Sequence, residues 1–430
     1  MAAKKIVIVG LGYVGLPLAM VCAEKGFLVH GIDTDEEKIA SLRQDVSPIE
    51  DVRDSEIEKA RKLGNFVVDS NFSIADGFDV ALLALPTPLN QGEPDLTALV
   101  TASENLASFI SEGSLIIVES TVFPGCTESI IIPILEKVSG LRCGRDFGVA
   151  YSPERINPGD KEWTLRNTPK ITSGVDEESS RGCESFYAEL GIPTFPVSTV
   201  RTAEFTKLLE NTFRFVNISF VNELMTVAED LEIDLWESIG AADSKPFGFV
   251  KFTPGPGVGG HCLPVDSVYL SWITRKASQK DLSIVDAATE VNRKMPEFVA
   301  SRVQKQLQLS AIPVSEAKVL LLGLAYKADI GDIRESPALA LANILNEQGA
   351  RVYALDPWVR KNRWPTEVIR AEEFDSQHFD IAVLMTAHSD KSLTAKVLQS
   401  GIPVIDTRNH FNANAVNTLG RSGLDRKSVV

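Results

Sequence analysis

A strand–loop–helix–strand pattern that occurs twice constrains the fold of this chain more than any other feature. Residues 4–35 read KKIVIVGLGYVGLPLAMVCAEKGFLVHGIDTD, and residues 317–357 read AKVLLLGLAYKADIGDIRESPALALANILNEQGARVYALDP. Each segment starts with an apolar run, passes through a loop and a helical stretch, and ends its second apolar run at an aspartate, Asp33 or Asp356. Alternating strand and helix patterns are typical of parallel sheets covered by helices. The chain is therefore predicted to contain two such units.

The same alternation continues through about the first 200 residues. Further strand candidates are DVALLALP, SLIIVEST and FGVAYSP, and the helical pattern DLTALVTASENLASFISE lies between the first two. We predict an α/β fold with two doubly wound, Rossmann-like domains, one over residues 1–200 and the other over residues 313–430.

The centre of the chain has a different, helical pattern. Neither glycine nor proline interrupts residues 202–239, and a second helical stretch covers residues 283–308. Residues 201–312 are therefore predicted to form a central α-helical region whose long connecting helix joins the two Rossmann-like domains. Two long helices in this place also predict a dimerisation surface, and hence a homodimer or a higher homo-oligomer.

Composition and charge exclude several classes of partner. The chain has 430 residues, a net charge of −15 and no run rich in lysine and arginine, so a nucleic-acid partner is not expected. Its five cysteines form no CxxC pair, which predicts neither a metal site nor disulfides and favours a reducing compartment. The apolar run at residues 6–23 resembles a secretory signal, but three glycines and Pro17 interrupt it. We therefore expect a cytoplasmic protein without a membrane partner.

The first loop has the spacing of a dinucleotide-binding site. Gly10, Gly12 and Gly15 form a GxGxxG motif between a predicted strand and a predicted helix, where glycines permit a tight turn and close approach of a pyrophosphate. Asp33 ends the next strand, and a carboxylate there accepts hydrogen bonds from a ribose diol and repels a 2′-phosphate. The pattern favours NAD over NADP. A glycine-rich turn that serves only packing is the alternative.

Cys262 follows the glycine-rich segment PGPGVGG and precedes Asp266. Backbone N–H groups without side-chain cover suit a diphosphate or an oxyanion, and a thiol at the end of the loop could act as a nucleophile. A sterically tight turn explains the glycines equally well when the loop is considered alone. The other four cysteines, Cys22, Cys126, Cys143 and Cys183, are interpreted as small buried apolar residues.

Further polar residues lie where ligands of such folds bind. Lys207, Asn211 and Arg214 recur at helical spacing on one predicted helix, and a partly buried lysine can stabilise an alkoxide. In the second Rossmann-like unit, Lys327 and Arg334 bracket the altered loop and could hold nucleotide phosphates. Other candidates follow predicted strands, at the edge where doubly wound sheets bind ligands: Thr87, Thr121, Glu154 and Arg155. Solvated surface charge is the alternative for the cations.

Together these segments resemble the nucleotide-sugar 6-dehydrogenase family, which includes the UDP-glucose and UDP-N-acetylhexosamine dehydrogenases. The resemblance covers about residues 4–415 and depends on GLGYVG, ESTVFPG, SPER, AEFTKLLENTFR, PGPGVGGHCLPVD, VNRKMP and GLAYKADIGDIRESP. SPERINPG and PGPGVGGHC are more similar to the N-acetylhexosamine branch than to the glucose branch. This implies UDP-N-acetylglucosamine as the substrate, with UDP-N-acetylmannosamine next and UDP-glucose as a further alternative.

The resemblance implies a four-electron oxidation of the sugar C6 hydroxyl to a carboxylate by two NAD⁺. Cys262 would form a thiohemiacetal and then a thioester, Lys207 would stabilise oxyanions, and Asp266 would act as a base or orient water. Glu154 would assist hydrolysis. The implied catalytic set is completed by Thr121 and Asn211. The implied NAD contacts are Gly10, Gly12, Tyr13, Val14, Gly15, Asp33, Lys38, Thr87, Thr121 and Arg334. The implied UDP-sugar contacts are Arg155, Lys207, Asn211, Arg214, Gly257, Gly259, Tyr326 and Lys327.

Two positions depart from the family pattern. Pro158 stands where the glucose enzymes have a second glutamate, which leaves fewer candidate bases for hydrolysis, and Ser267 stands where a proline often follows the aspartate. Two other functions remain open from the sequence: a two-electron dehydrogenase with a structural cysteine, and a non-catalytic nucleotide-binding protein.

Overall fold

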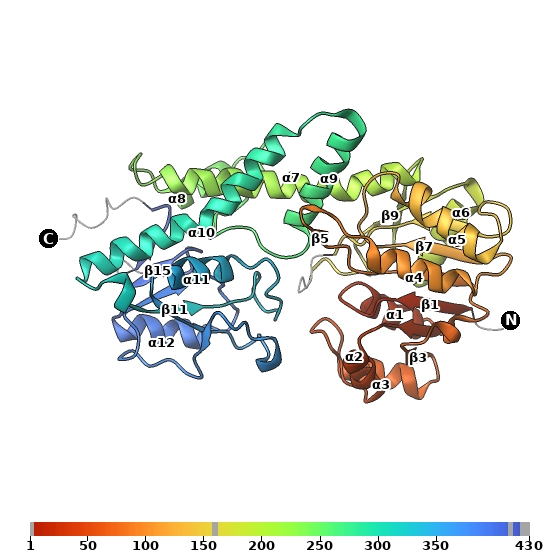
Figure 1. Ribbon diagram of the computed structural model, residues 1–430, viewed down its shortest axis with the longest axis horizontal. Coiled ribbons are helices and arrows are strands. Elements are labelled where there is room, and N and C mark those ends of the chain that lie inside the picture. The colour runs from red at the N-terminus through yellow and green to blue at the C-terminus, as the bar shows by residue number, and fades with distance from the viewer. Residues whose placement is uncertain (1–3, 157–161, 412–415, 422–430) are drawn as a thin grey trace. The chain divides into compact units, whose positions relative to one another are not determined.

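The computed structural model describes residues 4–156, 162–411 and 416–421 (Figure 1). The chain forms two compact units. The first unit consists of Met1–Glu210 and Val268–Ala277, and the second of Asn211–Ser267 and Ser278–Val430. Each unit is built around one large sheet, and we describe the two separately.

The first unit contains an eight-stranded sheet in the order β10-β9-β8-β7-β4-β1-β2-β3. The bounds of these strands are β1 Lys5–Val9, β2 Leu28–Ile32, β3 Phe66–Asp69, β4 Val80–Leu83, β7 Leu115–Val118, β8 Gly148–Tyr151, β9 Lys170–Gly174 and β10 Thr194–Pro196. All neighbouring strands are parallel except β8 and β9, which are antiparallel and pair Tyr151 with Ser173. A small hairpin adds β5 (Leu89–Asn90) and β6 (Glu93–Pro94).

Helices cover both faces of this sheet, which is why its central strands are apolar throughout. The bounds are α1 Gly15–Glu24, α2 Glu36–Arg43, α3 Asp54–Lys62, α4 Thr97–Ala107, α5 Ile132–Ser139 and α6 Glu177–Leu190, with short turns η1 Phe72–Ala75 and η2 Thr127–Ile131. Ile6, Ile8 and Ile117 belong to the same buried cluster as residues of α1 and α6. Their neighbours on the opposite face, such as Val7 and Ile116, are also fully buried.

Four helices form the central region: α7 Val200–Val227, α8 Leu235–Asp243, α9 Leu263–Ser278 and α10 Ser283–Leu309. The helical pattern at residues 202–239 is thus two helices. Glu232 has a positive φ of 57°, and the Asp234 side chain caps the N-terminus of α8, so the chain turns between them. The helix α9 follows the glycine-rich segment directly.

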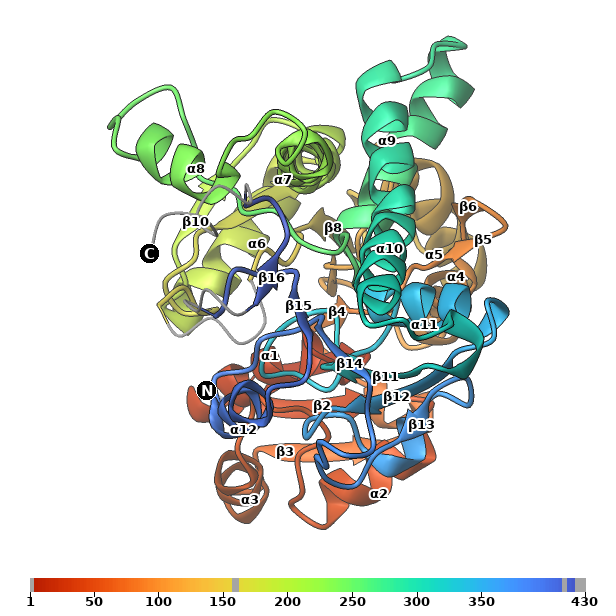
Figure 2. The same cartoon turned by 90° about the vertical axis from the view of Figure 1, so that its left-hand side faces the viewer.

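The second unit contains a six-stranded parallel sheet in the order β13-β12-β11-β14-β15-β16. Its strands are β11 Lys318–Leu322, β12 Arg351–Leu355, β13 Ile369–Arg370, β14 Ile381–Leu384, β15 Val404–Asp406 and β16 Asn417–Thr418. The other elements are α11 Pro337–Glu347, α12 Ser392–Ser400, η3 Val314–Glu316 and η4 Lys361–Arg363. Helices α10 and α11 pack on one face and α12 on the other (Figure 2). The predicted α/β fold, with two doubly wound sheets and a helical region between them in the sequence, is confirmed.

Candidate functional site

The loop between β1 and α1 has the shape that a pyrophosphate requires. Gly10 has a positive φ of 94°, and a Cβ there would lie 2.3 Å from the Ala84 carbonyl oxygen. A Cβ at Gly15 would lie 1.9 Å from the Gly10 carbonyl oxygen, so α1 packs directly against the loop. No atom lies within 4 Å of a Cβ placed on Gly12. The two outer glycines are needed for packing, and the middle one leaves open space at a helix N-terminus.

Asp33 lies beside this loop, at the end of β2. Its Oδ2 accepts a hydrogen bond from Leu11 N at 2.8 Å and forms an ion pair with Lys38 Nζ at 2.6 Å. The carboxylate therefore faces the glycine loop, where it could also accept hydroxyl groups of a ribose. The Tyr13 hydroxyl, on the same loop, donates to Glu50 at 2.9 Å. These residues fit a bound dinucleotide.

Two further predicted residues lie at the same edge of the sheet. The buried Thr87 hydroxyl donates to Thr121 O at 2.7 Å, which ties the segment after β4 to the segment after β7. The Tyr269 hydroxyl donates to Thr87 O at 2.9 Å, and Tyr269 is fully buried on α9. Thr87 and Thr121 are thus brought together, as expected for residues that follow neighbouring parallel strands.

Glu154 and Arg155 are both held by other protein groups. Glu154 Oε1 accepts from Arg155 N at 2.6 Å and Ile156 N at 2.8 Å, and Glu154 Oε2 accepts from Lys170 Nζ at 3.2 Å. Burial alone would raise the pKa of Glu154, but the Lys170 charge and the two N–H donors outweigh it and lower that pKa. The Arg155 guanidinium donates to both carboxylate oxygens of Glu210 and to Pro169 O.

Cys262 is exposed, directly before the first turn of α9. Asp266 N donates to Cys262 O at 2.9 Å, so the buried Asp266 lies one turn below the thiol. Its Oδ2 accepts a hydrogen bond from the Asn211 side-chain amide. The fold therefore brings together Asp266 and Asn211, which are far apart in the sequence, in the second unit. Lys207, further back on α7, is buried at 9% exposure in the first unit.

The glycines before Cys262 are explained by packing within the second unit. A Cβ at Gly259 would lie 2.6 Å from Glu335 O, and a Cβ at Gly260 would lie 2.7 Å from the Tyr326 ring. Gly260 N donates to Arg334 O at 3.0 Å. The segment is thus pressed onto the altered loop that follows β11. This close contact adds a second reason for the glycines to the predicted approach of a phosphate.

Charged groups surround the thiol in the same unit. Burial raises the pKa of Tyr326 to about 12, and the charges of Cys262 and Asp332 add to this effect. Arg334 donates to Asp332 through Nε at 3.0 Å and through Nη2 at 2.6 Å, which raises the pKa of the guanidinium. Arg214 also acts electrostatically on Tyr326. Two of the predicted cations, Arg334 and Arg214, therefore lie within electrostatic range of Tyr326, as does Cys262.

Sequence reasoning missed Arg408, which lies after β15. Burial lowers its pKa to about 10, its Nε donates to Met385 O at 2.9 Å, and a Cβ at Gly255 would lie 2.5 Å from its Nη1. A small pocket at this edge is lined by Pro256, Ala325, Tyr326, Ser336, Pro337, Ala338, Met385, Thr386 and Arg408. The only available signal was an arginine directly after a strand, at the edge where such sheets bind ligands.

Buried amides fix the start of the thiol loop. Asn222 Oδ1 accepts from Gly255 N at 2.8 Å, and Asn222 Nδ2 donates to Asn292 Oδ1 at 2.9 Å. Asn292 in turn donates to Ser219 Oγ and to Ala288 O. This network joins α7 to α10 and explains why an asparagine occupies the VNRKMP segment.

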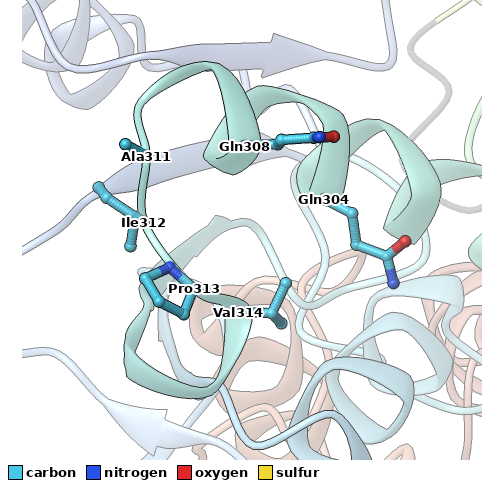
Figure 3. Close-up of a pocket in the computed structure, with 6 residues that line it drawn as sticks. All are labelled: Gln304, Gln308, Ala311, Ile312, Pro313 and Val314. Atoms are coloured by element: carbon cyan, nitrogen blue, oxygen red, sulfur yellow. The ribbon is translucent and has the colours of Figure 1, made fainter.

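A second hollow, of about 450 Å³, lies away from these residues, at the end of α10. Figure 3 shows the residues that line it: Gln304, Gln308, Ala311, Ile312, Pro313 and Val314. It contains no charged side chain and none of the predicted site residues. In the described ranges, no group of three or more His, Cys, Asp or Glu side chains could hold a metal ion. Nor does any described helix combine the length and the hydropathy needed to cross a bilayer.

Comparison with known proteins identifies the family. Three family models match in succession: the NAD binding domain of the UDP-glucose/GDP-mannose dehydrogenase family over residues 4–191, its central domain over residues 201–294 and its UDP binding domain over residues 320–413.

Individual relatives agree with these matches. The UDP-N-acetyl-D-glucosamine 6-dehydrogenase of Pseudomonas aeruginosa is 37% identical over 392 residues, which cover 90% of this chain and 91% of that protein. The UDP-N-acetyl-D-mannosamine dehydrogenase of Pyrococcus horikoshii is 36% identical over 430 residues, which cover 99% and 100%. A solved structure of the UDP-D-ManNAc dehydrogenase from Pyrococcus horikoshii superposes with a TM-score of 0.87 at 33% identity, covering 97% of this chain and 99% of that chain.

These matches confirm the resemblance, the NAD cofactor and a UDP-sugar substrate that were expected from the sequence. The chain belongs to the UDP-glucose/GDP-mannose dehydrogenase family, as a NAD-dependent UDP-sugar dehydrogenase.

Proposed function

We propose that the protein oxidises the C6 hydroxyl of a UDP-N-acetylhexosamine to a carboxylate through a covalent intermediate on Cys262. The observation that supports this most is the exposed thiol at the start of α9, above the buried Asp266–Asn211 pair and within the electrostatic range of Tyr326 and Arg334. Relatives named for N-acetylglucosamine and N-acetylmannosamine are 37% and 36% identical to this chain. We take UDP-N-acetylglucosamine as the first candidate substrate and UDP-N-acetylmannosamine as the second.

The thiol answers a chemical requirement of the second oxidation. An aldehyde cannot lose a hydride to give an acid until a nucleophile has added to its carbon. The Cys262 sulfur would form a C–S bond to that carbon, and the aldehyde oxygen would take up a proton to give a thiohemiacetal. Loss of a hydride and of the hydroxyl proton converts this species to a thioester. Water then adds, the C–S bond breaks, and the carboxylate and the Cys262 thiol are released. Bound NAD⁺ supplies the hydride acceptor for both oxidations.

The remaining roles follow from the chemistry of each side chain. Lys207 presents a buried ammonium group that would stabilise negative charge developing on the substrate oxygen. Asp266 would accept a proton or orient a water, with Asn211 fixing its direction. Glu154 would accept the proton of the hydrolytic water. We retain Thr121 and the other predicted NAD and UDP-sugar contacts as part of the same proposal, including Arg155 and Arg334, whose present partners are carboxylates.

The wider organisation forms part of the proposal as well. We infer that the two Rossmann-like domains at residues 1–200 and 313–430 bind the two nucleotides, and that residues 201–312 link them and hold a homodimer together. The exposed apolar side chains of α7 support the dimer: Phe205 is 44%, Leu209 51%, Phe213 52% and Phe220 58% exposed. We also infer a cytoplasmic location, because all five cysteines lie in the described part of the chain and none forms a disulfide there.

The test is product stoichiometry across a panel of substrates. UDP-N-acetylglucosamine, UDP-N-acetylmannosamine, UDP-N-acetylgalactosamine and UDP-glucose would each be incubated with NAD⁺, and NADH and sugar acid would be quantified. We expect two NADH per sugar acid, with fastest turnover on an N-acetylhexosamine. One NADH per sugar with release of an aldehyde would indicate a two-electron dehydrogenase. Activity on UDP-glucose alone would contradict the proposed substrate branch.

A further inference from the structure

The antiparallel strand β9 places an unassigned lysine at the ligand-binding edge of the first sheet. In a parallel sheet, the first residue of a strand lies at the edge opposite the ligand site. Because β9 runs against β8, with Ala150 opposite Gly174 and Tyr151 opposite Ser173, its first residue lies at the other edge. Continuing this register beyond β8 places Lys170 opposite Glu154.

Lys170 there joins two carboxylates. Its Nζ lies 3.1 Å from Glu119 Oε1 and 3.2 Å from Glu154 Oε2, and the side chain is only 3% exposed. Glu119 directly follows β7, is fully buried, and also accepts a hydrogen bond from the Tyr187 hydroxyl. Lys170 Nζ lies 5.1 Å from the centre of the Tyr187 ring. Two acids therefore share one buried cation.

The two acids differ in their surroundings, and this difference determines which of them is charged. Burial raises the pKa of Glu119, and the attraction of Lys170 only partly offsets this. No residue in the described part of the chain makes a hydrogen bond to Glu119 Oε2. Glu154 receives two backbone N–H donors in addition to Lys170, and its pKa is lowered. A single proton shared by such a pair resides on the acid with the raised pKa. Glu154 is therefore the acid of the pair that ionises more readily, and Glu119 keeps a proton to higher pH.

Glu154 retains room for one more hydrogen bond. A carboxylate offers about four acceptor positions, and hydrogen bonds from the residues that the structure describes occupy three of those on Glu154. The two backbone donors use Oε1, and Lys170 uses one of the two acceptor positions of Oε2. Lys170 therefore fixes the direction in which the second position of Oε2 points. Glu154 also keeps 9% of its side chain exposed, whereas Glu119 keeps none.

We propose that Lys170 is a positioning residue for hydrolysis of the Cys262 thioester: it holds Glu154 ionised and directs its free acceptor position toward the hydrolytic water. The inference rests on the proposed function. In the step it assists, the water oxygen bonds to the thioester carbon, one water proton passes to Glu154, and the C–S bond breaks to return the Cys262 thiolate.

The test separates formation of the acyl-enzyme from its hydrolysis. Wild-type protein and the Lys170→Met variant would be mixed with NAD⁺ and the best UDP-sugar of the panel. NADH release would be followed by stopped flow, and the covalent adduct on Cys262 by intact mass. In Lys170→Met we expect the adduct to form and to accumulate, with hydrolysis slower than in the wild type near neutral pH, because burial then raises the pKa of Glu154 with no adjacent cation to offset it.

The pH profile distinguishes this role from a purely structural one. Without Lys170, burial would raise the pKa of Glu154, so the ionised base is lost near neutral pH and regained as the pH rises. Hydrolysis by Lys170→Met should therefore recover in alkaline solution, and Lys170→Arg should keep a profile close to that of the wild type. Tyr187→Phe is the matched control, since it removes a hydrogen bond to Glu119 and leaves the Lys170–Glu154 pair intact. If Lys170→Met does not fold, Lys170→Gln has the same expected result.

The outcomes for the inference and for the proposed function are distinct. An adduct that never appears in the wild-type protein would contradict the proposed function itself. An adduct that appears in the wild type and is hydrolysed by Lys170→Met at the wild-type rate, with an unshifted pH profile, would overturn the role of Lys170 and leave the proposed function standing.

Discussion

The strand order β4-β1-β2-β3 of the first unit is repeated as β14-β11-β12-β13 in the second. Both first loops begin with a glycine of positive φ, 94° at Gly10 and 87° at Gly323. Gly10 packs against Ala84, which follows β4, and Gly323 packs against Thr386, which follows β14. Both second strands are followed by a buried aspartate that accepts a backbone N–H of its loop. Leu11 N donates to Asp33 at 2.8 Å, and Leu324 N donates to Asp356 at 2.7 Å.

The two loops differ in length and content beyond this first glycine. In the first unit α1 begins at Gly15, directly after the loop, and Gly12 borders open space. In the second unit Ala325 occupies the corresponding place, and α11 begins only at Pro337. The longer loop presents Tyr326 and packs against the thiol segment. The comparison teaches that one strand frame can hold either a short loop that leads directly into a helix or a longer loop that packs against a second segment of the chain.

The largest expected effect comes from removing the Cys262 thiol, whose segment packs against the second loop. We expect Cys262→Ala to lower the rate of sugar-acid formation by at least roughly 1,000-fold, because no other group on the loop can form the covalent intermediate. Binding of NAD⁺ and UDP, measured by calorimetry, should persist. Cys143→Ala is the control, since burial raises the pKa of this thiol to about 12 and keeps it unreactive. Unchanged turnover in Cys262→Ala would remove the covalent mechanism.

Replacing Gly12 of the first loop by alanine, the residue at the corresponding position Ala325 of the second loop, tests the dinucleotide site. Gly12→Ala puts a methyl group into space that no protein atom occupies, so thermal stability should not fall. If the pyrophosphate approaches there, NAD⁺ affinity should drop by the equivalent of roughly 1–3 kcal/mol, the usual cost of overpacking. UDP affinity should not change. Gly240→Ala, also in open space, is the control, and equal NAD⁺ affinity in both variants would place the cofactor elsewhere.

The sequence predicted the features that depend on local pattern. Apolar periodicity and glycine spacing were sufficient for both doubly wound sheets, and the resemblance selected Cys262 and Asp266, which the first turn of α9 brings together. The end of α7 at Val227 was missed, because the turn at Glu232 depends on a positive φ that glutamate seldom adopts.

Residues that depend on strand direction were missed as well. Lys170 looks like an ordinary lysine before a short strand, and only the antiparallel pairing of β8 and β9 brings it to Glu154. Arg408 is a single cation after β15, and its burial follows from the packing of a distant glycine, Gly255, against it. Neither the direction of pairing nor a contact across more than a hundred residues is visible in local sequence.

A smaller effect tests how the second loop holds the thiol segment. A Cβ at Gly260 would meet the Tyr326 ring at 2.7 Å, so Gly260→Ala should destabilise the second unit by roughly 1–3 kcal/mol in urea unfolding. Gly401→Ala isolates the backbone contribution, because Gly401 also has a positive φ, of 76°, and no atom within 4 Å. Gly260→Ala should cost more than Gly401→Ala. Equal losses would mean that the contact with Tyr326 contributes nothing.

The smallest effect concerns how the free energy of unfolding depends on pH. One buried carboxyl in each unit should contribute to this dependence, with opposite signs. In the first unit, burial raises the pKa of Glu204 to about 7, although Thr127 N donates to it at 2.9 Å. The native state then binds a proton more tightly than the unfolded chain, so this contribution is present in acid and lost as the pH rises through about 7. In the second unit, burial would raise the pKa of Asp356, but His388 and two backbone N–H groups outweigh it and lower that pKa. Its contribution is lost only as the pH falls below the ordinary value of 3.8.

Glu204→Gln should therefore abolish a stability change of roughly 1 kcal/mol between about pH 6 and about pH 8, as measured by chemical unfolding. Its absolute stability should fall slightly, since Gly125 N and Thr127 N donate to different oxygens of Glu204 and the amide nitrogen that replaces one oxygen cannot accept. Glu177→Gln, at an exposed carboxylate paired with Arg181, should keep the wild-type pH dependence. If Glu204→Gln keeps it too, the carboxyl is already ionised throughout this range. The hydrogen bonds from Gly125 N and Thr127 N to Glu204 would then be independent of pH between about 6 and about 8, as are those from Leu324 N and Ala325 N to Asp356.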